Sequence, residues 1–134
     1  MAESGPTPAV SPGNRPVEMS LRCSDLKASV HFYGDLLGLP LTHADPHEGD
    51  EVEHFEVSWG EPGKNDFFMM ILWPAAIGQH TSNAYVGFAT DDLQALNRRL
   101  LDAGVTIVLP PTQKPWGWCA EYRDPDGNTV FVNG

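Results

Sequence analysis

The same succession of structural patterns occurs twice in this sequence. Leu26 opens a helical pattern of apolar residues that ends at Gly38, and Leu93 opens a second helical pattern that ends at Gly104. In each half, a strand pattern precedes the helix and further strand patterns follow it. Because a fixed internal period marks a repeated supersecondary unit, the sequence predicts two copies of one module.

The periods of the apolar residues place the elements of each module. We predict helices over residues 26–37 and 93–101, with Ser24 or Asp25 and then Thr90 or Asp91 as their N-caps. We predict strands over residues 17–23, 39–43, 53–59, 67–73, 84–89, 105–109, 118–123 and 129–132. Pro110 and Pro111 are expected to end the strand before them.

Composition limits the classes of protein that the chain can belong to. Residues 1–16 are rich in Pro, Ser, Gly and Ala without periodicity, so we predict a disordered tail before one domain over 17–134, with modules at about 17–74 and 84–134. The formal net charge of −10 argues against nucleic acid or an anionic membrane as partner. With no apolar run of membrane length and no apolar signal core, we expect a cytoplasmic protein.

Two motifs narrow the fold further. The first runs from Phe32-Tyr33 to Leu37-Gly38-Leu39, and the second combines Pro115-Trp116-Gly117 with the turn Asp-Pro-Asp-Gly-Asn at 124–128. With both motifs, the chain resembles the vicinal-oxygen-chelate superfamily of glyoxalases, bleomycin-resistance proteins and extradiol dioxygenases. The resemblance implies an α+β fold of two βαβββ modules, whose curved mixed sheets form a ligand cleft. It also implies a homodimer.

The resemblance assigns four places to metal ligands in the metal-dependent members of the superfamily. Carried over to this sequence, those places hold Glu18, Met70, Tyr85 and Phe131. One carboxylate with a thioether, a phenol and a phenyl ring does not provide the donors that a divalent metal requires. We therefore expect no metal and no cofactor. An alternative metal site of His43, His47 and His54 matches no tight ligand spacing.

Residues on the polar side of the predicted strands should face the cleft, because the helices cover the apolar side. Aromatic residues on that side can stack on planar ligands, and carboxylates there attract cationic groups. Trp59 and Trp73 are instead expected to pack structurally. The predicted ligand-binding residues are Glu18, His54, Glu56, Met70, Tyr85, Trp116, Trp118 and Phe131.

A cleft of this kind binds ligands but offers little chemistry. We predict no catalytic residue and a protein that sequesters a bulky, partly aromatic natural-product antibiotic without modifying it. This function resembles that of the metal-free bleomycin-resistance proteins. One alternative is an enzyme of the same superfamily, a metal-dependent or acid/base lyase, isomerase or dioxygenase. Another is a regulatory or scaffolding domain with a vestigial cleft.

Overall fold

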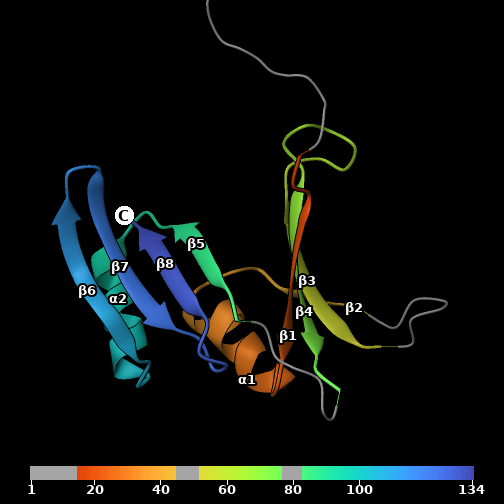
Figure 1. Cartoon of the computed structure of the whole chain (residues 1–134), viewed down its shortest axis with the longest axis horizontal. Coiled ribbons are helices and arrows are strands. Elements are labelled where there is room, and N and C mark those ends of the chain that lie inside the picture. Colours follow the sequence, from red (N-terminus) through yellow and green to blue (C-terminus); the bar gives the residue numbers. More distant parts are fainter. Residues whose placement is uncertain (1–14, 45–51, 77–82) are drawn as a thin grey trace, which may run out of the picture.

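The computed structural model describes residues 15–44, 52–76 and 83–134. These residues form two four-stranded sheets that lie splayed apart (Figure 1). The strand order is β1-β4-β3-β2 in the N-terminal sheet and β5-β8-β7-β6 in the C-terminal sheet. In both sheets the first strand of the module runs parallel to the last, and the other pairs are antiparallel. The predicted α+β fold of two βαβββ modules is thus confirmed.

The two modules contain matching elements. The N-terminal module comprises β1 (Glu18–Cys23), α1 (Leu26–Val30), η2 (His31–Leu36), β2 (Thr42–Ala44), β3 (His54–Trp59) and β4 (Phe68–Pro74). The C-terminal module comprises β5 (Tyr85–Ala89), α2 (Leu93–Asp102), β6 (Ile107–Lys114), β7 (Gly117–Arg123) and β8 (Thr129–Asn133). The first predicted helix is therefore a short α-helix that continues as the π-helical turn η2.

Two local predictions are wrong. Strand β6 continues through Pro110 and Pro111, because it lies at the edge of its sheet and its pairing with β7 shifts register between Leu109 and Thr112. A proline on an edge strand interrupts few ladder hydrogen bonds. The N-cap of α2 is Asp92, whose carboxylate accepts from the Ala95 N–H at 3.0 Å.

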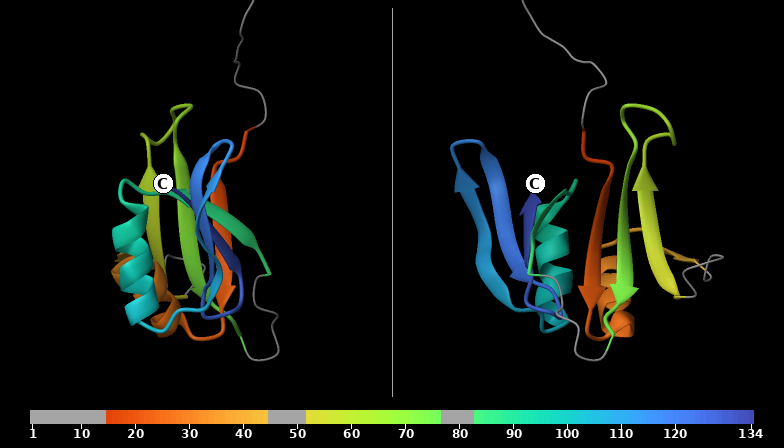
Figure 2. Two further views of the ribbon diagram at one scale, coloured as in Figure 1. Left: turned by 90° about the vertical axis from the view of Figure 1, so that its left-hand side faces the viewer. Right: turned by 45° about the vertical axis from the view of Figure 1, so that its right-hand side comes forward.

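The helices lie next to each other on one side of the molecule (Figure 2). Arg99 of α2 donates from Nε to the Leu36 carbonyl at the end of η2, at 2.7 Å. One apolar core runs through both modules, with Leu21, Phe32, Leu96 and Val130 among its buried members. We call the helix-packed side of each sheet its inner face and the other side its open face. None of the helices in the described segments has the length and apolar composition of a membrane span.

A buried hydrogen-bond network joins the two sequence motifs. The Tyr33 hydroxyl donates to Asp124 Oδ2 at 2.6 Å, although 91 residues separate them. Asp124 also accepts from the backbone N–H groups of Asp126 and Asn128, both at 2.9 Å, and from Asn128 Nδ2 at 2.7 Å. Ser24, at the start of the first helix, donates from its backbone N–H to the Asp126 carboxylate. The C-terminal turn therefore holds the first helix in place.

Replacing Tyr33 by Phe should lower the free energy of unfolding by about 1–3 kcal/mol, because the buried Asp124 carboxylate loses one of its donors. Tyr85→Phe is the matched control, since the Tyr85 side chain is exposed and its loss of a hydroxyl should cost no more than about 0.5 kcal/mol. Urea unfolding at neutral pH measures both values. Equal midpoints for the two variants would contradict a stabilising role for the network.

Stability should fall in alkaline solution. Burial raises the pKa of the Cys23 thiol from 9.0 to about 11 and that of the Tyr122 hydroxyl from 10.0 to about 12. Burial, together with the Asp124 carboxylate, also raises the pKa of Tyr33. The folded chain thus favours the protonated groups, and the unfolded chain loses these protons first as the pH rises.

The contribution of Cys23 should be fully present below its unfolded pKa of 9.0 and disappear as the pH rises towards 11. Urea midpoints measured across this interval should decrease, and they should decrease less steeply in Cys23→Ala. A midpoint that stays constant or rises would contradict this assignment.

Candidate functional site

The open face of the N-terminal sheet carries polar and aromatic side chains. Register places Glu18 beside Met69, Ser20 beside Ile71 and Arg22 beside Trp73 in the β1–β4 pair. Strand β3 adds His54, Glu56 and Ser58 to the same face. The polar sides of β1 and β3 thus lie together, as the alternation in the sequence predicts.

Direct contacts connect these side chains into a row across the sheet. Trp73 Nε1 donates to Ser20 Oγ at 3.2 Å, and the Ser20 hydroxyl donates to Glu18 Oε2 at 2.7 Å. The His54 ring packs against the Trp73 ring with centroids 4.3 Å apart, and its Nε2 lies 3.1 Å from Glu56 Oε1. His54 is only 2% exposed, so it is covered by its neighbours and holds Trp73 and Glu56 in position. The row therefore fixes one indole ring and two carboxylates.

The open face of the C-terminal sheet presents a pair of aromatic rings. The Tyr85 and Phe131 rings are stacked, with centroids 6.1 Å apart and planes at 26°. Tyr85 is 62% exposed, and its hydroxyl donates to Glu121 Oε2 at 3.1 Å. Gly87 lies beside Phe131, and an added Cβ there would stand 3.7 Å from the ring. A ring system with a carboxylate at its edge is therefore available to a ligand.

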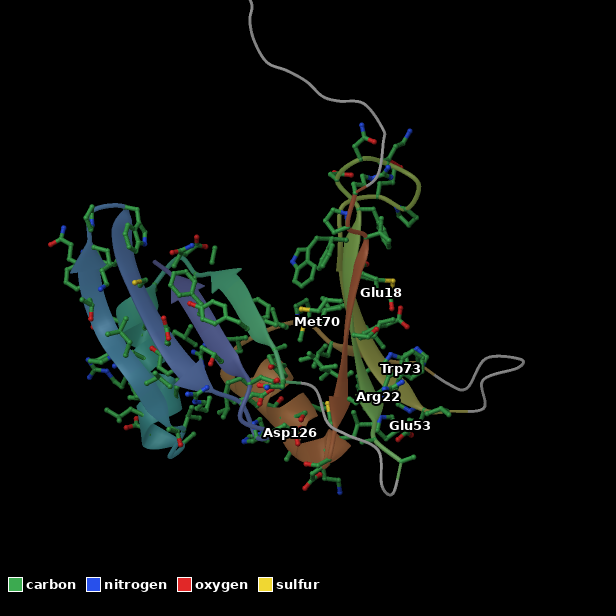
Figure 3. All side chains as sticks on the ribbon, in the orientation of Figure 1. Glu18, Arg22, Glu53, Met70, Trp73 and Asp126 are labelled. Atoms are coloured by element: carbon green, nitrogen blue, oxygen red, sulfur yellow. The ribbon has the colours of Figure 1, made fainter. Side chains whose placement is uncertain are left out.

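Within one chain the two open faces do not face each other. Figure 3 shows Glu18, Arg22 and Trp73 on the side of the N-terminal sheet that is turned away from the C-terminal sheet. Between the modules lies a different, apolar hollow of about 400 Å³, lined by Met19, Leu39, Trp59, Phe68 and residues 87–89 of β5. The candidate residues thus form two separate groups, one on each sheet, and the single cleft expected between the modules is not built from both open faces of one chain.

The predicted position of Met70 on the cleft-facing side of its strand is wrong. Met70 is completely buried on the inner face, where it belongs to the core and points towards the C-terminal sheet (Figure 3). The neighbouring Met69 pairs with Glu18 and occupies the open face. Strand β4 is apolar on both faces, so the sequence did not show which of its residues point to the open face. The pairing with β1 distinguishes the two methionines, because Met69 lies beside the polar Glu18 and Met70 beside the apolar Met19.

The two tryptophans of the second motif do not lie together on the open face. Trp118 is on the helix side of its sheet, 43% exposed, in a hollow with Asp91, Asp92 and Leu93 at the start of α2. Its predicted cleft position is therefore wrong. Trp116 occupies the two-residue turn between β6 and β7 and is 70% exposed. Its role as a ligand-facing ring stays a prediction.

Two residues of the open faces were missed as ligand-binding candidates in the sequence. Trp73 was expected to pack structurally, yet it carries the hydrogen bond to Ser20 on the open face. Glu121 was not considered, although Arg123 and Thr129 pair across the Asp-Pro-Asp-Gly-Asn turn and Glu121 therefore lies opposite Phe131. Counting outward from that turn would have placed Glu121 beside the predicted ring.

The residues at the superfamily's metal-ligand places do not fit a divalent metal. Glu18 is the one carboxylate among them, and it lies on a different sheet from Tyr85 and Phe131. Among the described residues, no group of three or more His, Cys, Asp or Glu side chains could hold a metal ion. His43 instead contacts Glu53 at 2.8 Å, while His47 lies outside the described residues.

Comparison with known proteins supports the fold and the family. Residues 15–132 match the Glyoxalase/Bleomycin resistance protein/Dioxygenase superfamily, and the chain belongs to this superfamily. Among curated protein sequences, none matches the chain.

Several solved structures have the same fold. TnmS3, described as an antibiotic binding protein from Streptomyces sp. CB03234, is 24% identical with a TM-score of 0.66, covering 90% of this chain and 94% of its own. UcmS2 is 20% identical with a TM-score of 0.64, covering 90% and 98%. TioX from Micromonospora sp. ML1 is 20% identical with a TM-score of 0.62, covering 89% and 97%. At these identities the likeness shows the fold alone.

Proposed function

We propose that this protein binds a bulky, partly aromatic natural-product antibiotic and holds it without chemical change, as a self-resistance protein. The observation that carries the proposal is the stacked Tyr85–Phe131 pair on an open sheet face. These rings occupy two places that the superfamily resemblance assigns to metal ligands. Aromatic rings at such places favour stacking on a planar ligand over metal-assisted chemistry. The printed description of TnmS3 as an antibiotic binding protein supports the same reading.

The open face of the N-terminal sheet would contribute the second wall. Trp73 adds an indole ring there, and Glu18 and Glu56 add carboxylates whose positions are set by Ser20 and His54. Because the open faces of one chain do not meet, a ligand enclosed on both sides requires two copies. The proposed active form is therefore a homodimer, in which the N-terminal sheet of one copy faces the C-terminal sheet of the other.

The proposal includes no nucleic acid or membrane as a partner, and a cytoplasmic location. The net charge of −10 supports the exclusion of nucleic acid and anionic membranes, because such a chain repels polyanions. The proposal also includes a metal-free cleft, because Glu18 is the one carboxylate at the superfamily's metal-ligand places and a divalent metal needs three or four suitable donors. An antibiotic sequestered in this way would leave the site chemically unmodified.

Titration against a panel of quinone, enediyne and glycopeptide antibiotics tests the proposed function. Phe131→Ala should weaken the tightest-binding member by roughly 2–4 kcal/mol, the range for truncation of an aromatic anchor. Trp116→Ala should weaken it by a similar amount, because the proposal places the hairpin ring against the ligand. Trp118→Ala is the matched control, since this ring lies on the helix side of the sheet, and binding should be unchanged.

Mass spectrometry of the recovered ligand, with and without a chelator, separates binding from catalysis. An unchanged ligand mass and an affinity insensitive to the chelator are the expected results. A modified ligand would place the protein among the lyases, isomerases or dioxygenases of the superfamily. If no member of the panel binds, sequestration of these antibiotic classes is wrong.

The dimer can be tested by analytical ultracentrifugation. The expected mass is about twice the 14.7 kDa of one chain at the concentrations used for titration. A species of one chain's mass that nevertheless binds the ligand tightly would contradict the two-copy site. Ligand binding itself would then have to take place on one open face.

A further inference from the structure

We propose that the ligand carries a protonated amine next to its planar ring system, and that Glu121 binds this amine. The proposal rests on the proposed function and specifies the chemistry of the ligand. Glu121 lies opposite Phe131 in the β7–β8 pair, and its Oε2 accepts from the Tyr85 hydroxyl. The carboxylate is therefore at the edge of the stacked rings, where a substituent of a ring-bound ligand would lie.

Glu121 lacks a cationic partner among the described residues. Arg123 is the next residue of β7 on the same face, but its Nη1 donates to the Gly127 carbonyl at 3.3 Å and to the Thr129 hydroxyl. Arg123 is thus directed to the turn and away from Glu121. A half-buried carboxylate with a single neutral donor retains free acceptor positions, and charge-assisted hydrogen bonds are the strongest that it can form.

An ammonium group fits these positions better than a neutral donor. It can donate to the Glu121 carboxylate and to the oxygen of the Tyr85 hydroxyl, because that oxygen keeps an acceptor lone pair while its proton goes to Glu121. Next to the Tyr85 and Phe131 rings, the cation also gains a cation–π attraction. The net charge of −10 would raise the local concentration of a cationic ligand and speed its encounter.

A metal ion is a poorer occupant of the same position. One carboxylate and one phenol hydroxyl do not make a divalent site, which needs three or four suitable donors. Cys119 lies on the same face of β7, but it is a buried free thiol. The geometry therefore selects an organic cation.

A matched pair of probes tests the inference on the intact protein. Daunorubicin has a planar quinone ring system with an amino sugar, and its N-acetyl derivative keeps the same rings without the positive charge. The wild-type protein should bind the amine about tenfold more tightly than the amide, the effect of one charge-assisted contact. This preference should shrink at high salt, because the contact is only half buried.

Glu121→Gln should weaken binding of the amine about tenfold and change binding of the amide less than about twofold. Glu61→Gln removes the same charge from an exposed turn between β3 and β4 and should leave both affinities unchanged. The comparison of the two probes on the wild-type protein needs no variant, so it holds even if Glu121→Gln fails to fold.

Equal affinities of the wild-type protein for the two probes would overturn the amine inference while leaving sequestration intact. Equal weakening of both probes by Glu121→Gln would also overturn it, since the carboxylate would then act by supporting the rings. If neither probe binds, this inference fails. The proposed function is judged separately, by the wider antibiotic panel.

Discussion

The buried hydrogen bond between Tyr33 and Asp124 is the contact on which the rest of the structure depends. It joins a helix of the N-terminal module to the turn between the last two strands of the C-terminal module. Because Asp124 is buried, its carboxylate requires donors, and Tyr33 supplies one that only the folded chain can bring near. The two sequence motifs that indicate the superfamily are therefore two halves of one interaction.

This contact determines which surfaces remain for function. Because the helices pack against the inner faces, the open face of each sheet carries no helix and is accessible to a ligand. One face offers Trp73 with Glu18 and Glu56, and the other offers Tyr85 and Phe131 with Glu121. The two faces combine rings with carboxylates in the same way, and they point in different directions. The proposal that a ligand binds between two open faces therefore requires that two copies of the chain pair.

The sequence was informative wherever polarity alternated along a strand. Glu18 and Tyr85 could be placed because their neighbours on either side are apolar, and His54 because it continues the polar series of Glu56 and Ser58. Met70 could not be placed, because β4 is apolar throughout. Trp118 was misplaced since an exposed tryptophan can lie on either side of an edge hairpin. The orientation of the sheets was not predictable, because it depends on a contact between residues 91 positions apart.

The indole N–H signals of the tryptophans provide the most direct test that the open faces bind the ligand. Trp73 lies on an open face, Trp59 lines the apolar hollow between the modules, and Trp118 of β7 lies beside the start of α2. Their signals in a ¹H–¹⁵N spectrum can be assigned by single Trp→Phe variants. Addition of the tightest-binding antibiotic should shift the Trp73 signal and leave those of Trp59 and Trp118 in place. A shift confined to Trp59 would place the ligand in the hollow and contradict the account.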